Sequence, residues 1–180
     1  INNVKAGDKI IVSDAIATHG VAIMSVREGL EFETAVKSDT RGLNHVVSKL
    51  LDEFGKDIHL LKDPTRGGIA TVLNEIARDR NHGVKISQKQ IPIQNEVNAL
   101  CEILGLDPLY VANEGVFIAV VDSRISEKFV KKLKSMDYGK NASIIGEITE
   151  SHPRQVVLTS SISGKRIVNM LAGEQLPRIC

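Results

Sequence analysis

The chain ends in a thiol at Cys180, and a thiol is well suited to carry a chemical group through covalent steps. Pro177 fixes its own φ and lacks an N–H, so the approach to the thiol is short and extended. Arg178 favours the thiolate and the terminal carboxylate disfavours it, so strong acidification is not expected. We therefore predict that residues 175–180 form a mobile tail that can present Cys180 to more than one active site. The alternative is that the chain simply ends on a cysteine.

A second candidate is the segment Asp63-Pro64-Thr65-Arg66-Gly67-Gly68, which separates a predicted strand from a predicted helix. Thr65 is expected to cap this helix, and the two glycines allow backbone N–H groups to approach another surface closely. A helix N-terminus beside a cation such as Arg66 is suited to bind an anion. The alternative is a turn at Asp63-Pro64 and a packing contact at Gly67-Gly68.

A third candidate is Asn113-Glu114-Gly115, which precedes the continuous β-rich run 116–121. A carboxylate held at the mouth of such a strand could act as a general base. On the residues alone, the alternative that Glu114 is one of many solvated carboxylates is favoured.

The five histidines show no spacing typical of metal ligands, so no metal site is predicted. His19 is the one histidine singled out, because it is expected in the loop that follows the first strand. A histidine held there by local hydrogen bonds is the simpler interpretation. Cys101 falls on the apolar face of a predicted helix and is interpreted as a small core residue.

The composition argues against several classes of function. A net charge of +1 and an aromatic content of 3% argue against a nucleic-acid binder. The two cysteines form no Cys-x-x-Cys pair, the longest apolar runs are too short to cross a bilayer, and no signal segment opens the chain. We therefore expect a cytoplasmic protein of one domain, without nucleic-acid or membrane partners.

Strands and helices alternate along the chain. Helices are predicted where apolar residues recur at helical spacing, and strands where short apolar runs are bounded by turns. Because the last strands lack intervening helices, the pattern favours a layered α/β (α+β) sandwich with a mixed sheet. The predicted strands are 9–13, 59–61, 84–87, 116–121, 143–148 and the pair 156–159 and 165–168; the predicted helices are 21–27, 43–54, 69–77, 97–104 and 126–136.

Four segments together resemble the hydrogenase maturation family HypE: residues 27–33, 63–68, 107–115 and the ending 173–180. The resemblance runs from near residue 7 to the last residue. Segment 63–68 is shared with aminoimidazole ribonucleotide synthetase and selenophosphate synthetase, whereas the Pro-Arg-Ile-Cys ending is particular to HypE. The resemblance implies the C-terminal α/β domain of the aminoimidazole ribonucleotide synthetase-like fold.

The resemblance also implies a reaction. In this family the carbamoyltransferase HypF places a carbamoyl group on the terminal cysteine, here Cys180. ATP with Mg²⁺ then activates the carboxamide oxygen, dehydration leaves a thiocyanate, and the cyanide passes to iron on a HypC–HypD complex. Glu114 matches the glutamate that is linked to proton removal. The resemblance makes Asp63, Arg66, Gly67, Gly68, Asn113 and His19 candidates for the substrate cleft, and Pro177, Arg178 and Ile179 candidates for tail recognition.

By the same resemblance, residues 1–174 correspond to a C-terminal domain and residues 175–180 to its tail. The family's N-terminal ATP-binding domain has no counterpart here, so we expect neither bound ATP or Mg²⁺ nor activity from this domain alone. A homodimer is expected for the full-length protein. Two alternatives stay open, namely a docking module for the carbamoyltransferase and a fragment of another aminoimidazole ribonucleotide synthetase-like enzyme.

Overall fold

The structure is a computed structural model, and it describes residues 3–27 and 36–171. The predicted tail, with Pro177, Arg178, Ile179 and Cys180, lies outside the described residues, as does most of segment 27–33. Among the described helices, none has the length and apolar character needed to cross a membrane.

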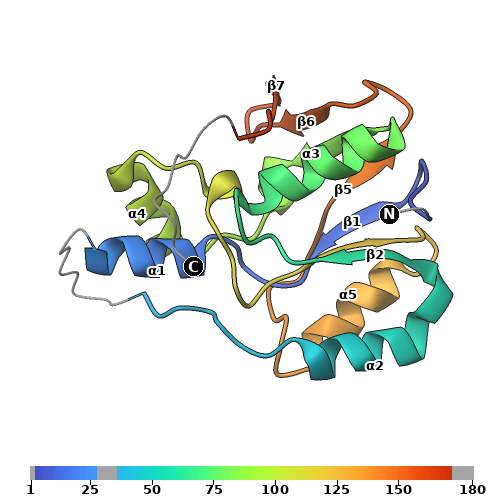
Figure 1. Cartoon of the computed structure of the whole chain (residues 1–180), viewed down its shortest axis with the longest axis horizontal. Helices are drawn as coiled ribbons and strands as arrows, with labels where there is room; N and C mark the ends of the chain where they lie inside the picture. Colours follow the sequence, from blue (N-terminus) through green and yellow to red (C-terminus); the bar gives the residue numbers. More distant parts are fainter. Residues whose placement is uncertain (1–2, 28–35, 172–180) are drawn as a thin grey trace.

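Seven strands form one mixed sheet in the order β2-β4-β1-β5-β3-β6-β7 (Figure 1). β3 and β6 run parallel, whereas the other neighbouring strands are antiparallel. The predicted mixed sheet is therefore confirmed, as is the predicted pairing of the last two strands. The strands are β1 (Lys9–Val12), β2 (Ile58–Lys62), β3 (Gly83–Ser87), β4 (Ile118–Val121), β5 (Ser143–Thr149), β6 (Val156–Thr159) and β7 (Lys165–Ile167).

Helices cover both faces of this sheet, because alternate residues of a strand point to opposite faces. Ile10 and Val12 of β1 pack into a core with α1, α3 and α4, whereas Ile11 packs into a second core with α2 and α5. Figure 1 shows α2 and α5 together on one side of the strands and α3 on the other. The helices are α1 (Thr18–Arg27), α2 (Asn44–Phe54), α3 (Gly68–Arg80), α4 (Asn95–Leu104) and α5 (Ser126–Lys134), with short 3₁₀ turns η1 (Gly55–Asp57), η2 (Gln88–Gln90) and η3 (Pro108–Tyr110).

The sequence placed the start of α1 wrongly. The helix begins at Thr18, so His19 lies in a helix and not in the predicted loop. Tertiary packing explains the early start, because Gly20 lets the helix press against the backbone of the 111–112 segment. A Cβ atom on Gly20 would lie 2.4 Å from Cγ1 of Val111 and 3.3 Å from the amide nitrogen of Ala112.

The predicted cap of α3 is also wrong. The N-cap residue is Gly67, which has a φ of +68° and makes no side-chain capping bond. Gly68 follows with a φ of +58°, and a Cβ there would lie 2.4 Å from the carbonyl oxygen of Leu109. The two glycines therefore serve a close packing contact between α3 and η3, and Thr65 only accepts a bond from the Gly68 amide through its carbonyl.

Antiparallel register gives the sheet two distinct ends. Ile118 at the start of β4 pairs with Val12 at the end of β1 and with Lys62 at the end of β2. We call this the pocket end of the sheet. At the opposite end, Val121 pairs with Lys9 and Ile58, which begin β1 and β2.

Candidate functional site

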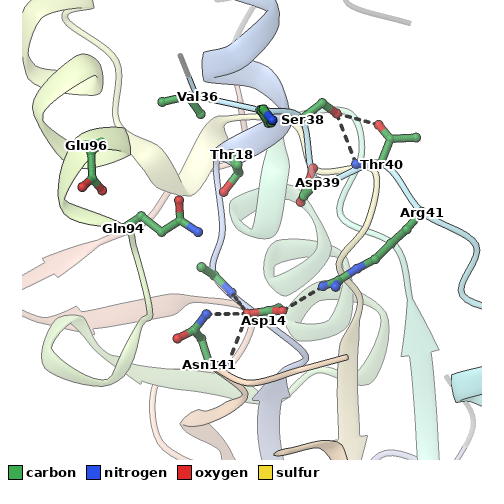
Figure 2. A pocket seen from close by; sticks show the side chains of 12 residues that line it. Asp14, Thr18, Val36, Ser38, Asp39, Thr40, Arg41, Gln94, Glu96 and Asn141 are labelled. Carbon is green, nitrogen blue, oxygen red and sulfur yellow. Dashed lines mark hydrogen bonds and ion pairs between the residues drawn. The ribbon is translucent and has the colours of Figure 1, made fainter. Parts of the chain in front are cut away.

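A cavity of about 660 Å³ opens at the pocket end of the sheet (Figure 2). One wall is formed by residues 36–41, which we call the strap, and the others by the segment after β1, the start of α4 and the residues before β5. Hydrogen-bonding side chains dominate this lining, including Asp14, Thr18, Asp39, Gln94, Glu96 and Asn141.

Asp14 ties the walls of this cavity together. Its carboxylate accepts bonds from Arg41 Nη2 (2.8 Å), from the amide of Ala15 (2.8 Å) and from Asn141 Nδ2 (2.8 Å). Figure 2 shows Arg41 and Asn141 reaching this carboxylate from two sides. Burial alone would raise the pKa of Asp14, but the hydrogen bonds from Arg41, Ala15 and Asn141 outweigh it and leave the pKa below its ordinary value.

The strap is held against the loop that contains Glu114. Arg41 Nε donates to the carbonyl of Gly115 (3.4 Å), and its guanidinium lies 3.8 Å from the centre of the Tyr138 ring. Gly115 is required at this contact, because a Cβ there would lie 1.8 Å from the carbonyl oxygen of Asp39. The strap therefore brings Asp39 and Arg41 directly beside Glu114.

Asp39 and His19 present unsatisfied polar atoms at this point. Both carboxylate oxygens of Asp39 and Nε2 of His19 are buried without a hydrogen-bond partner among the described residues. His19 Nδ1 lies 2.9 Å from Ser38 Oγ and 3.2 Å from Thr40 Oγ1, so the strap fixes the ring. Burial raises the pKa of Asp39, and the negative charge of Glu114 raises it further. The backbone amide of Asp39 and the positive charges of His19 and Arg41 partly offset this rise.

Asn113 is fully buried and joins three segments of the chain. Its Oδ1 accepts a bond from the amide of Ala17 (2.8 Å), while Nδ2 donates to the carbonyls of Pro64 (3.2 Å) and Val111 (2.9 Å). These bonds fix the backbone on which the half-exposed Glu114 stands at the entrance to β4. Asn113 therefore positions the loop and has no donor left for a ligand.

Segment 63–68 also lies at the pocket end, directly after β2. Asp63 and Arg66 are exposed, and neither has a bonded partner in the part of the chain that the structure describes. Gly67 and Gly68 pack against Thr71 and η3 rather than line the cavity. The structure thus brings His19, Asn113 and Glu114 together, and leaves Asp63 and Arg66 facing outward.

The polar residues that hold the cavity together carry no signal in a sequence motif. Asp14, Asp39, Arg41 and Asn141 belong to no motif, and all four lie outside the segments predicted as strands or helices. The run Ser38-Asp39-Thr40 was the available signal, since short hydrogen-bonding side chains gather there between two helices. The interpretation of Cys101 as a core residue is confirmed, because it is buried and burial raises its pKa to about 11.

The arrangement suits the handling of N–H groups and protons. Unpaired, buried carboxylate oxygens accept hydrogen bonds, and carboxylates beside a cavity can take up protons. The lining contains the acidic residues Asp14, Asp39 and Glu96 and the basic residues Lys37 and Arg41, so its formal charge is slightly negative. An amide or another N–H donor is therefore a better occupant of this cavity than a phosphate.

Comparison with known proteins supports the predicted family. Residues 5–158 match the family described as AIR synthase related protein, C-terminal domain. Carbamoyl dehydratase HypE from Rhizobium leguminosarum bv. viciae is 45% identical over 176 residues, which cover 98% of this chain and 50% of that protein. The same protein from Bradyrhizobium diazoefficiens is 43% identical and is covered to 51%. The chain thus spans about half the length of the curated relatives it matches.

Solved structures agree with this similarity. A crystal structure of hydrogenase maturation protein HypE matches with a TM-score of 0.94 at 41% identity, over 99% of this chain and 57% of that one. HypE in complex with ATP matches with a TM-score of 0.92 at 41% identity, over 99% of this chain and 54% of that one. The HypE–HypF complex matches with a TM-score of 0.87 at 41% identity, over 93% and 54%. With the family match over residues 5–158 and the same mixed sheet, the chain belongs to the C-terminal domain family of the AIR synthase related proteins, and within it is similar to HypE.

Proposed function

We propose that this chain is the part of a HypE-type carbamoyl dehydratase that carries the acceptor thiol, Cys180, and the base, Glu114. The observation that carries the proposal is the position of Glu114 at the pocket end, on a loop fixed by Asn113 and beside Asp39, whose carboxylate has no hydrogen-bond partner among the described residues. The relatives that the chain matches over half their length are named carbamoyl dehydratase HypE.

The chemistry needs a base and an acceptor of N–H bonds. A carbamoyl group on the sulfur of Cys180 has an amide nitrogen that must lose its protons as the carbon–oxygen bond breaks and a nitrile forms. ATP supplies the phosphoryl group that makes this oxygen a good leaving group. Glu114 would take one of the two protons from the nitrogen, and the second would leave with the departing phosphate as the nitrile forms, while the cavity beside Glu114 offers Asp39 as an acceptor for an N–H bond.

The proposed partners follow from the same similarity. A crystal structure of a HypE–HypF complex exists among the matches, so we propose HypF as the donor of the carbamoyl group. A structure of HypE with ATP supports ATP use, with Mg²⁺ to offset the phosphate charge, in the longer protein. We assign the nucleotide site chiefly to the part of the relatives that this chain does not span. Delivery of cyanide to a HypC–HypD complex, homodimerisation and a cytoplasmic location are further parts of this proposal.

The decisive experiment is Glu114→Gln in the full-length protein, incubated with HypF, carbamoyl phosphate and ATP. We expect Cys180 to accept carbamoyl normally and to convert it to thiocyanate about 10²–10⁴-fold more slowly, because glutamine keeps the shape of the side chain but cannot take a proton. The two tail products differ by the mass of one water, so mass spectrometry follows each step separately.

Glu150→Gln is the matched control, because Glu150 is exposed beyond β5 at the opposite end of the sheet. It should leave both steps unchanged, and Cys180→Ser should abolish both. If the Glu114→Gln protein dehydrated its tail at the normal rate, Glu114 would be structural. Carbamoylation without any dehydration in the unaltered protein would instead favour the docking-module alternative.

A further inference from the structure

Three potential metal ligands meet at the end of the sheet opposite the cavity. Asp8 precedes β1, His59 lies in β2 and Asp122 follows β4, and one ligand atom from each lies within 4.8 Å of the others. The strand register brings them together, since Lys9 and Ile58 both pair with Val121. Because the three residues are widely separated in the sequence, no spacing motif could reveal the cluster.

One oxygen of the Asp8 carboxylate has no hydrogen-bond partner in the described part of the chain. Asp8 is only 1% exposed. Its Oδ2 accepts a bond from the amide of Lys5 (2.9 Å) and lies 2.7 Å from Nδ1 of His59. Its Oδ1 is buried and has no hydrogen-bond partner among the described residues. A buried carboxylate oxygen without a partner costs free energy that a bound cation would remove.

The cations already near the cluster come from exposed side chains. Lys5 Nζ lies 3.2 Å from Oδ2 of Asp122, and Arg124 Nε lies 2.8 Å from Oδ1. Arg124 Nη2 also lies 3.0 Å from Oδ2 of Asp122. The Lys5 and Arg124 side chains are 61% and 75% exposed, so both can move into solvent, but each competes with a metal ion for the Asp122 carboxylate. Asp122 and His59 are each 8% exposed at their side chains and stay in place.

We propose that Asp8, His59 and Asp122 bind a divalent cation, with Zn²⁺ as the best match. One imidazole nitrogen with two carboxylates is a ligand set that zinc accepts, whereas Mg²⁺ and Ca²⁺ prefer oxygen ligands alone. The cation would replace Lys5 and Arg124 as the partner of Asp122 and would complete the coordination of Asp8. Bound there, it would join β1, β2 and β4 at the end of the sheet away from Glu114, so the proposal does not depend on the proposed function.

The test is calorimetric titration of the full-length, chelator-treated protein with Zn²⁺ alone. We expect the unaltered protein to show one Zn²⁺ site that His59→Gln lacks or binds about 10–100-fold or more weakly, because the imidazole ligand is lost. Asp8→Asn should have a similar effect. The double variant Lys5→Met, Arg124→Met removes the competing cations and should bind Zn²⁺ more tightly than the unaltered protein. His45→Gln, at an exposed position of α2, is the control and should change nothing.

Several outcomes would overturn the proposal. Equal Zn²⁺ binding by the unaltered protein and His59→Gln would assign the metal to other residues. No tightening in the Lys5→Met, Arg124→Met protein would mean that Asp122 is not a ligand. Since Asp8→Asn removes a buried group and could unfold the chain, the other two variants decide the question if it does.

Discussion

Carboxylates of low exposure lie at both ends of the sheet, and the backbone that carries them is held in place differently at each end. At the opposite end, Asp8 and Asp122 stand at strand termini, and their neighbours are fixed by the ladder itself. At the pocket end, Asp14 and Asp39 stand on loops that single side chains hold in place. The backbone at the pocket end can therefore be rearranged by one substitution, whereas the backbone at the opposite end is held by the sheet.

The strap offers the largest effect that would break this comparison. Gly115→Ala puts a methyl group 1.8 Å from the carbonyl oxygen of Asp39, and backbone on both sides must move. We expect a loss of roughly 3 kcal/mol in the free energy of unfolding and loss of the dehydration step. Urea unfolding measures the first and tail mass spectrometry the second.

Gly42→Ala is the matched control for this strap variant. A Cβ there meets only the flexible Asn44 side chain, at 3.2 Å, so stability should change little. A Gly115→Ala protein as stable as the Gly42→Ala protein would show that the strap is not held as described. Zn²⁺ binding at the opposite end should survive in both variants.

Asn113→Ala should have an intermediate effect. It leaves the amide of Ala17 and the carbonyl of Val111 without their partner in a buried position, whereas the carbonyl of Pro64 keeps its bond from the backbone amide of residue 113. The expected loss is roughly 2 kcal/mol, with slower dehydration because Glu114 is no longer held in place. Asn98→Ala, at an exposed position of α4, is the control, and chemical denaturation compares the stability of the two variants. Equal stability would refute the role of Asn113 in joining the three segments.

The sequence predicted the layers of the fold well because they depend on local periodicity. Apolar residues at helical spacing located α2, α4 and α5, and short apolar runs located the strands. The strand 116–121 was predicted two residues too long, since Val116 and Phe117 are buried without joining the ladder. The predicted start of α1 was wrong because the true start depends on a packing contact between Gly20 and residues 111–112, which no local pattern encodes.

The site was predictable only where a motif carries it. The resemblance pointed to Glu114 and Asn113, and the structure places them at one end of the sheet with His19. Asp39 and Arg41 were not predicted, because their role arises only when the strap crosses Gly115. The cluster of Asp8, His59 and Asp122 escaped for the same reason, as it is assembled by strand register alone.

The smallest expected effect is a pair of opposite changes in how stability depends on pH. Burial raises the pKa of Asp39, so the carboxyl costs stability as the pH rises from the unfolded-state pKa to the folded-state pKa, and the cost is complete above the latter. Asp39→Asn should therefore stabilise the protein at neutral pH, and the gain should disappear below about pH 4, where the carboxyl is protonated in folded and unfolded chains alike.

Hydrogen bonds from Arg124 hold the pKa of Asp122 well below its usual range, so that carboxylate stabilises the fold above about pH 4. Asp122→Asn should therefore destabilise the protein at neutral pH, and the loss should begin to shrink once the pH falls below about 4, where the unfolded chain takes up the proton first. Thermal unfolding between pH 3 and 8 in chelating buffer measures both variants, with Asp52→Asn on the exposed face of α2 as the control. If both variants shifted stability in the same direction at pH 7, the carboxylates at the two ends would not differ in how they are hydrogen-bonded. Asp39 would then not be an acid that lacks hydrogen-bond partners beside Glu114.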